Sequence, residues 1–220
     1  MRVGVIGAGR IGGNTARLLA NAGHETTLSF ARDQGRLQAL GADIGARVAS
    51  SPSEAVESAE VVVFAVPWSA IPEALEQAGS LAGKIVIDTT NQFGSGPMPA
   101  DGQTAAQFNA ARMPGARYTK SFNTLTSGFQ AEAAGRAGAD RVVQWICGDD
   151  EQAKQIVAQL IDDAGFAPVD VGGTAECAIM EAPRRPGAVY GEEYRLPDAE
   201  AVVAAVRARG PIPPTPDYYG

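Results

Sequence analysis

Residues 1–12 read MRVGVIGAGRIG, and this stretch decides the fold. Its first six residues form a short apolar run that is typical of a buried parallel strand. The next six have the spacing G-x-G-x-x-G, residues 10–21 continue with helical periodicity, and residues 25–30 form a second strand pattern. A strand, a glycine-rich turn, a helix and a strand within about 30 residues predict a dinucleotide-binding βαβ unit.

The three glycines of the turn have separate physical roles. Gly7 permits the tight turn, Gly9 lets the backbone approach a pyrophosphate, and Gly12 lets the helix pack closely on the strand. The start of the helix then offers N–H groups and a positive dipole end to the phosphates. An ordinary strand–helix turn with permissive glycines is the alternative interpretation.

The end of the second strand indicates which dinucleotide binds. NAD sites usually place Asp or Glu there to hold the ribose 2′-hydroxyl. Residues 28–33 read LSFARD, so Ser29 and Arg32 stand at the strand end, with no acidic residue before Asp33. An arginine can grip a 2′-phosphate with two hydrogen bonds. We therefore expect NADP(H), unless Arg32 is a solvated surface residue or is paired with Asp33.

Strand and helix patterns alternate along the rest of the chain. This alternation predicts an α/β fold with a doubly wound parallel sheet, the Rossmann NAD(P)-binding fold. We expect an NADP-binding domain over residues 1–172 and a C-terminal extension over residues 173–220, which contributes to the cleft or to oligomerisation. About eight strands are expected, at residues 1–6, 25–30, 47–49, 60–67, 84–88, 117–121, 141–147 and 167–171.

Ligands of such sheets bind beyond the carboxyl ends of the strands. Trp68 follows one strand and is interpreted either as a neighbour of the nicotinamide or as an apolar lid residue. Asn91, Asn123 and Thr124 follow two other strands and serve either as hydrogen-bonding groups for the ligand or as turn and cap residues. Lys120 is interpreted as a phosphate or substrate contact or as a solvated strand residue. Gly148 is placed at the same edge.

Composition limits the classes of partner. The 220-residue chain has a net charge of −7, which argues against nucleic-acid and anionic membrane partners. No signal peptide and no apolar run of membrane-spanning length are visible. Cys147 and Cys177 match no metal-ligand spacing, and no metal site is expected. Unpaired cysteines favour a reducing, cytoplasmic location.

The chain lacks residues for common acid–base catalysis, and no catalytic side chain is predicted. His24 is the only histidine, and it lies at the amino edge of the predicted sheet, away from the cofactor. Hydride transfer between two rings needs correct stacking in a dry cleft and no protein acid or base. This absence favours hydride exchange between NADPH and a second carrier.

Several short motifs, taken together in their order and spacing along the chain, resemble one family. The motifs are GAGRIG at 7–12, Ser29 and Arg32, AVPW at 65–68, DTTN at 88–91, KSFNTL at 120–125 and CGDD at 147–150. Together they resemble the coenzyme F-420-dependent NADP oxidoreductases over residues 1 to about 172. The same fold resembles the cytoplasmic domain of six-span membrane metalloreductases, which passes hydride to a flavin.

The resemblance implies hydride transfer between NADPH and a 5-deazaflavin, coenzyme F-420, or a flavin as second substrate. It places Gly7, Gly9, Arg10 and Ile11 at the pyrophosphate and Ser29 and Arg32 at the 2′-phosphate. It also places residues 66–68 beside the ribose and nicotinamide, and residues 122–124 near the nicotinamide face. Phe30 departs from the family pattern, in which small polar residues are common. The complete set of expected cofactor-binding residues is Gly7, Ala8, Gly9, Arg10, Ile11, Gly12, Ser29, Phe30, Arg32, Ala65, Val66, Pro67, Trp68, Thr90, Asn91, Phe122, Asn123 and Thr124.

Two other functions stay open at this point. An NADPH-dependent reductase of imines or carbonyls would resemble pyrroline-5-carboxylate reductases, which carry a longer helical dimerisation domain than residues 173–220 provide. A non-catalytic NADP(H) sensor or partner-binding protein is the third interpretation. A small-molecule hydride acceptor is the expected partner of the first two, and a homodimer is the expected assembly.

Overall fold

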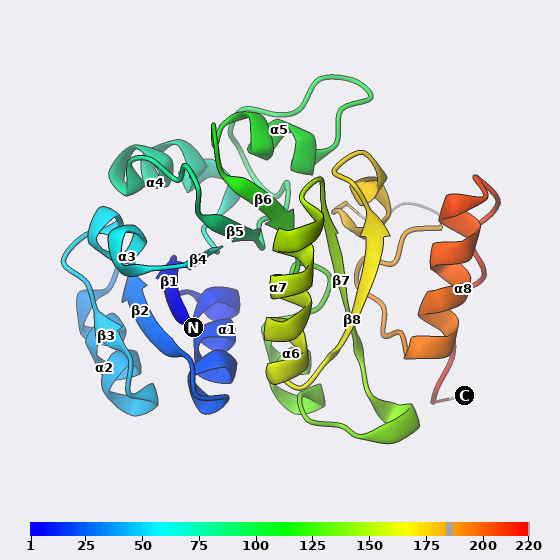
Figure 1. The fold of residues 1–220 in the computed structure, drawn as a ribbon, viewed down its shortest axis with the longest axis horizontal. Helices are drawn as coiled ribbons and strands as arrows, with labels where there is room; N and C mark the ends of the chain where they lie inside the picture. Colours follow the sequence, from blue (N-terminus) through cyan, green and yellow to red (C-terminus); the bar gives the residue numbers. More distant parts are fainter. Residues whose placement is uncertain (184–186, 220) are drawn as a thin grey trace.

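The computed structural model describes residues 1–183 and 187–219 and contains one eight-stranded sheet (Figure 1). The strand order is β3-β2-β1-β4-β5-β6-β7-β8. The α/β fold predicted from the alternation of strand and helix patterns is therefore confirmed. The strands are β1 (Arg2–Ile6), β2 (Glu25–Ser29), β3 (Arg47–Val48), β4 (Val61–Phe64), β5 (Ile85–Asp88), β6 (Arg117–Lys120), β7 (Val143–Gly148) and β8 (Ala167–Gly172).

The sheet is mostly parallel, which corrects the expectation of a wholly parallel one. Strands β1 to β6 are parallel, whereas β7 pairs with β6 in the antiparallel direction, with Lys120 opposite Cys147. Strand β8 is parallel to β7. The carboxyl end of β7 therefore points to the opposite edge of the sheet, and the placement of Gly148 at the ligand edge was wrong.

Helices cover both faces of the sheet (Figure 1). One face is covered by α1 (Arg10–Asn21), α2 (Gln34–Ile44), α6 (Ser127–Ala133) and α7 (Glu151–Asp163). The other is covered by α3 (Pro52–Ser58), α4 (Ile71–Ala78), α5 (Ala105–Ala111), α8 (Leu196–Arg207) and the 3₁₀ turn η3 (Glu176–Met180).

Buried side chains alternate between the two faces along each strand. In β4, Val61 and Val63 pack under α1 and α7, whereas Val62 and Phe64 pack on the side of α4 and α5. This alternation follows from the period of two in an extended chain. Both faces are apolar because helices cover both of them, as the continuous apolar runs predicted.

The C-terminal segment packs on its own chain. Helix α8 lies beside β8 (Figure 1), and residues Val202 and Val203 join the core under that face of the sheet. Beyond α8, the Tyr218 hydroxyl donates to Asp198 over 2.6 Å and accepts from the Arg195 N–H over 2.9 Å. The described part of the tail is therefore held against the protein.

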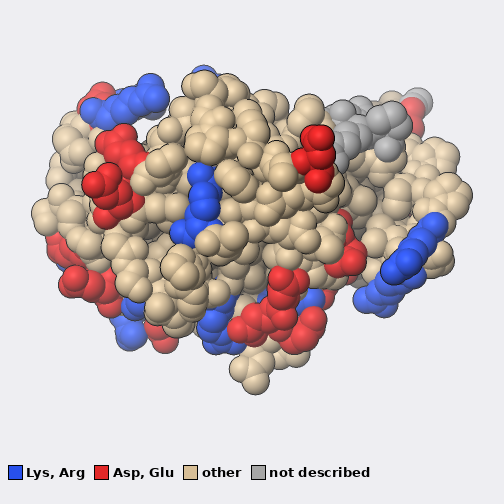
Figure 2. All heavy atoms as spheres, turned by 90° about the horizontal axis from the view of Figure 1, so that it is seen from above, with Lys and Arg blue, Asp and Glu red and all other residues tan. Residues whose placement is uncertain are grey.

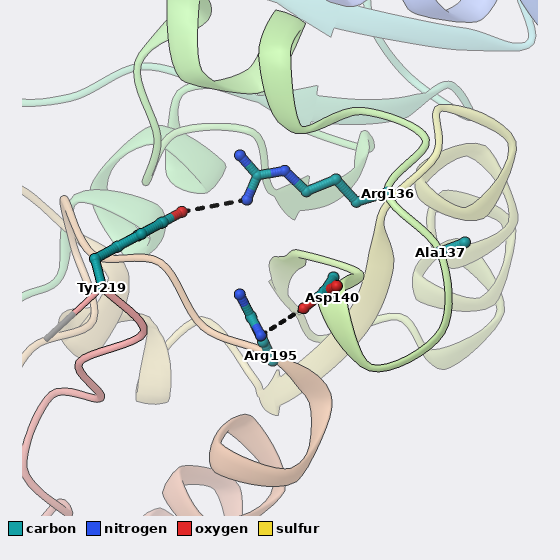
Figure 3. A pocket seen from close by; sticks show the side chains of 5 residues that line it. All are labelled: Arg136, Ala137, Asp140, Arg195 and Tyr219. Carbon is teal, nitrogen blue, oxygen red and sulfur yellow. Dashed lines mark hydrogen bonds and ion pairs between the residues drawn. The ribbon is translucent and has the colours of Figure 1, made fainter.

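A pocket of about 350 Å³ lies where this tail ends (Figure 3). Arg136 donates to the Tyr219 hydroxyl over 3.3 Å, and Arg195 forms a 2.6 Å ion pair with Asp140. The Tyr219 hydroxyl also donates to Glu193. Each arginine that lines this pocket already has a carboxylate or hydroxyl partner within the protein.

On the face seen in Figure 2, Lys and Arg side chains are dispersed among Asp and Glu side chains. This distribution agrees with the net charge of −7. Within residues 1–183 and 187–219, no helix combines the length and the apolar character that crossing a bilayer requires.

Candidate cofactor site

The glycine-rich turn connects β1 to α1 and has the conformation that a dinucleotide site needs. Gly7 has φ +98°, and a Cβ atom there would overlap the Ala65 carbonyl group. A Cβ atom on Gly12 would overlap the Gly7 carbonyl oxygen. Both glycines are therefore required by the close approach of β1, β4 and α1.

Gly9 differs from these two glycines because its Cβ position is open. No atom lies within 4 Å of a Cβ built there, and Gly9 is the N-cap residue of α1 without a side-chain cap. The N–H groups in the first turn of α1 therefore lie at an open surface. Arg10, the first residue of this helix, is exposed. We call this surface, formed by Gly9 and the first turn of α1, the cofactor cradle. Its free N–H groups suit an anionic group such as a pyrophosphate.

The end of β2 carries the residues expected at the 2′-phosphate. Arg32 is exposed, and it forms no ion pair with any residue in the described part of the chain. Asp33 accepts a 3.0 Å hydrogen bond from the Arg36 N–H and caps α2. The Asp33 carboxylate is therefore engaged by the helix, and the Arg32 guanidinium stays available to a ligand.

Ser29 lies deeper than its neighbour Arg32. Its side chain is buried, and its hydroxyl donates to the Val5 carbonyl over 3.0 Å. The hydroxyl oxygen can still accept a hydrogen bond. Phe30 follows with φ +56°, and Phe122, at the end of β6, has φ +55°. Two of the three non-glycine residues with positive φ in the described chain thus lie at strand ends on this edge, where strained residues often mark a functional site.

The residues that follow β4 pack against neighbouring segments of the site. Trp68 is 1% exposed, its indole N–H donates to the Pro97 carbonyl over 2.9 Å, and its ring stacks on Phe108 with the centroids 6.1 Å apart. The indole is thus held between α5 and the loop at residues 93–102. Ala65 and Val66 approach the Gly7 turn, and Pro67 is exposed.

The ends of β5 and β6 are joined by side-chain amides. The Asn91 amide donates to the Asn123 carbonyl over 2.9 Å, and the Asn123 amide donates to Asn91 over 3.2 Å and to the Met180 carbonyl over 2.6 Å. Phe122 is fully buried and packs edge-on against Phe166. The structure therefore brings Asn91 and Asn123 together and turns Phe122 into the core.

Three buried polar atoms at the end of β6 lack a hydrogen-bond partner among the described residues. They are the Ser121 hydroxyl, the Asn123 side-chain oxygen and the Thr124 hydroxyl. Buried polar groups are almost always hydrogen-bonded in native proteins. These three atoms are therefore candidates to bind the polar groups of a ligand. Ser121 belongs to the strand-end segment 121–124 that the sequence placed at the ligand edge.

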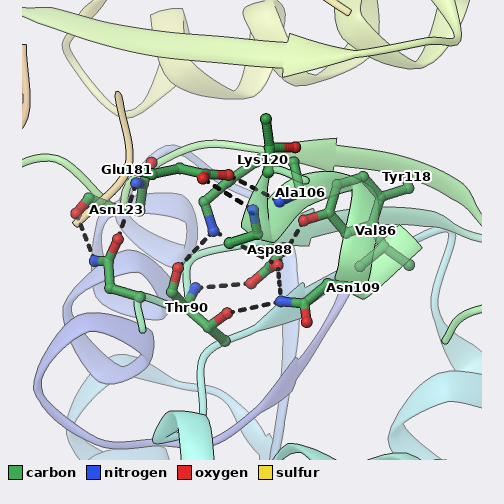
Figure 4. Close-up of polar contacts among 12 residues, drawn as sticks. Val86, Asp88, Thr90, Ala106, Asn109, Tyr118, Lys120, Asn123 and Glu181 are labelled. Atoms are coloured by element: carbon green, nitrogen blue, oxygen red, sulfur yellow. Dashed lines mark hydrogen bonds and ion pairs between the residues drawn. The ribbon is translucent and has the colours of Figure 1, made fainter. Parts of the chain in front are cut away.

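A buried charged cluster lies directly under this edge (Figure 4). Asp88 and Lys120 stand opposite each other in β5 and β6, and their charged atoms are 3.6 Å apart. Asp88 also accepts from the Thr90 N–H, the Asn109 amide and the Tyr118 hydroxyl over 2.6 to 2.7 Å. Lys120 donates to the Thr90 carbonyl. Lys120 is thus buried, and the interpretation as a solvated strand residue was wrong.

The cluster shifts the titration of two of its members. Burial by itself lowers the pKa of Lys120, but the attraction of Asp88 raises this pKa above its ordinary value. Burial and the Asp88 carboxylate raise the pKa of Tyr118 well above its ordinary value. Lys120 therefore carries a buried positive charge at neutral pH.

Glu181 links the C-terminal segment to this cluster. Its carboxylate accepts from the N–H groups of Ala105 and Ala106 over 2.9 and 2.8 Å, at the start of α5 (Figure 4). A carboxylate at a helix start is stabilised by the free N–H groups and the dipole. Sequence reasoning missed Glu181 and Asp88, although a lone acid at the end of the apolar run KIVID was a visible signal.

His24 lies away from these residues. It contacts the Met1 amino group over 3.2 Å and Asp163 over 3.0 Å, next to the amino ends of β1 and β2. This position confirms that the single histidine is at the edge opposite the candidate site. In the described part of the chain, no group of three or more His, Cys, Asp or Glu side chains could hold a metal ion.

Residues 2–92 match the family model described as NADP oxidoreductase, coenzyme F420-dependent. Over this segment, the resemblance expected from the motifs is confirmed. The matched residues include the glycine-rich turn, the end of β2 with Arg32, and the strand ends of β4 and β5. The family consists of NADP-dependent oxidoreductases.

Known proteins are similar to the chain beyond this segment. The chain is 30% identical to the metalloreductase STEAP3 of Rattus norvegicus over 181 residues, which cover 82% of the chain and 36% of that protein. The chain thus spans about a third of the length of this relative. The likeness is to that portion of the metalloreductase.

Two solved structures share the fold over most of their length. A hypothetical protein from Sinorhizobium meliloti is 26% identical, with a TM-score of 0.77 over 89% of this chain and 96% of its own. A provisionally assigned F420-dependent NADP reductase from Arthrobacter sp. FB24 is 27% identical, with a TM-score of 0.68 over 81% of this chain and 87% of its own.

Proposed function

We propose that the protein is an NADP(H)-dependent oxidoreductase that transfers a hydride between NADPH and a deazaflavin or flavin-type acceptor. The observation that carries this proposal is the open surface at Gly9, at the start of α1, together with Arg32, which is exposed and forms no ion pair within the described residues. The family match over residues 2–92 supports the same cofactor.

Different residues of the chain bind different parts of NADPH. The N–H groups at the start of α1 hold the pyrophosphate, and Arg32 holds the 2′-phosphate with its guanidinium. The Ser121, Asn123 and Thr124 side chains supply the polar atoms that a carboxamide or a ribose would satisfy. NADPH supplies the hydride, which moves with both electrons and leaves NADP⁺.

The protein contributes position and a dry environment to the transfer. Asp88, Lys120 and Asn109 lie buried beneath the strand ends and fix the positions of Thr90 and the residues after it. Stacking two rings at the right distance lowers the entropic cost of their encounter. This role requires no acid or base on the protein, in agreement with a site at the opposite edge from His24.

The test is anaerobic mixing of the protein with NADPH and either coenzyme F-420 or FMN, followed by absorbance. Loss of the acceptor's visible band at a rate that depends on protein concentration supports the proposal. Turnover with imines or carbonyls alone would contradict the proposal and indicate a reductase of small molecules instead. Tight NADPH binding without turnover on any acceptor would indicate a sensor. The homodimer, the cytoplasmic location and the boundary at residue 172 stay predictions.

Gly9→Ala tests the cofactor cradle separately from the fold. Because the added Cβ meets no protein atom, the melting temperature should change little, whereas the methyl group would occupy the approach of the pyrophosphate. We expect NADPH affinity to fall about tenfold, the equivalent of one lost hydrogen bond. Calorimetric titration measures the affinity.

Gly128→Ala is the matched control, since its Cβ position is equally open and it lies on the exposed side of α6. It should leave NADPH affinity unchanged. Equal affinities for the Gly9→Ala and Gly128→Ala proteins would remove Gly9 from the pyrophosphate site.

A further inference from the structure

Phe93 and Tyr190 form an aromatic corner beside the ends of β5 and β6. Their ring centroids are 6.2 Å apart, and the ring planes meet at 57°. The two residues come from distant parts of the chain, the loop after β5 and the segment before α8. A pair in this tilted arrangement presents one ring face and one ring edge to the same space.

Backbone hydrogen bonds tie the segments that carry both rings to the residues after the strand ends. The Phe93 N–H donates to the Asn91 carbonyl over 2.7 Å, and Asn91 is tied to Asn123. Beside Tyr190, the Gly191 N–H donates to the Thr124 carbonyl over 2.9 Å. The corner is therefore anchored to residues 91, 123 and 124. All three are expected cofactor-binding residues, and 123 and 124 are expected near the nicotinamide face.

The corner leaves apolar surface uncovered. Phe93 is 55% exposed, and Met98, in the same loop, is 47% exposed. Large exposed apolar side chains in one loop beside a polar site are typical of ligand-binding surface. A flat ring system laid on Phe93 would bury this surface and gain aromatic contact with Tyr190.

Tyr190 lies close to the buried charged cluster. Tyr190 is partly buried, and the positive charge of Lys120 acts on its hydroxyl. Burial raises the pKa of Tyr190, and Lys120 lowers it. Lys120 is itself paired with Asp88 over 3.6 Å, so the Tyr190 side of the corner adjoins a buried ion pair.

We propose that Phe93 and Tyr190 bind the planar ring of the hydride acceptor, a polycyclic heteroaromatic compound of the flavin or deazaflavin class. This inference rests on the proposed function and assigns its second-substrate site. It gives residues 187–191 a role in binding the acceptor.

Fluorescence titrations of oxidised F-420 and FMN, with NADP⁺ titrated in parallel, test the site. Phe93→Ala should raise the dissociation constant of the acceptor about 2- to 13-fold, the range expected for one aromatic contact. The NADP⁺ constant should stay within about twofold, because Phe93 lies outside the cradle. Tyr190→Phe should retain the ring contact and bind the acceptor nearly as well as the unmodified protein, whereas Tyr190→Ala should weaken it.

Leu196→Ala is the control, since Leu196 is a comparably exposed apolar residue, 44% exposed, on α8. It should change neither constant. Unchanged acceptor affinity in Phe93→Ala and Tyr190→Ala, with the unmodified protein binding the acceptor, would overturn this site alone. An unmodified protein that binds NADP⁺ but neither acceptor would overturn the proposed function together with the inference.

Discussion

Asp88→Ala is expected to lower the free energy of unfolding by about 3–5 kcal/mol, because it leaves the buried Lys120 ammonium without its partner. Both side chains are fully buried, so water cannot replace the missing carboxylate. The Asn109 amide and the Tyr118 hydroxyl would lose their acceptor as well. Urea denaturation at neutral pH, followed by circular dichroism, measures the loss.

The pH dependence of the loss identifies its cause. In the unmodified protein the pKa of Lys120 lies above its ordinary value of 10.5, so the stability contributed by its charge is present below that pH and is lost as pH rises through the folded-state pKa. Without Asp88, burial dominates and lowers the pKa of Lys120. The deficit of Asp88→Ala should therefore shrink as pH rises toward 10.5.

A double-mutant cycle supplies the control. Lys120→Met removes the charge and keeps much of the side-chain volume, so the double variant Asp88→Ala/Lys120→Met should recover part of the stability that Asp88→Ala loses. If the losses in free energy of unfolding of the two single variants simply added in the double variant, the ion pair would not be the source of the stability that Asp88→Ala loses.

The N-terminal half of the site could be predicted from sequence because its chemistry is local. The glycine spacing, the following helix and Arg32 all lie within residues 1–32, and short-range backbone geometry determines their arrangement. The structure places Gly7, Gly9 and Gly12 as this geometry requires.

The remaining differences come from long-range contacts that local patterns do not encode. The apolar run of β7 reads the same in either direction, so its antiparallel pairing with β6 could not be inferred from residues 141–147. Lys120 is buried only because Asp88 stands opposite it on the next strand. The association of Phe93 with Tyr190 joins segments about 100 residues apart and depends on the return of the C-terminal segment to the strand ends.

Arg32→Ala is expected to weaken NADPH binding about 10- to 150-fold, the range for losing charge-assisted hydrogen bonds to one phosphate. NADH lacks the 2′-phosphate, so its affinity should change little. Arg32 is exposed and has no ion pair within the described chain, so its removal should leave the melting temperature nearly unchanged. Calorimetric titration with both dinucleotides measures the two affinities.

Arg207→Ala, at an exposed arginine at the end of α8, removes the same charge far from the glycine-rich turn and should affect neither affinity. Raising the salt concentration should reduce the advantage of NADPH over NADH in the unmodified protein, since exposed charges are screened, and should do so much less in Arg32→Ala. Equal losses for NADPH and NADH in Arg32→Ala would place this arginine outside the 2′-phosphate site.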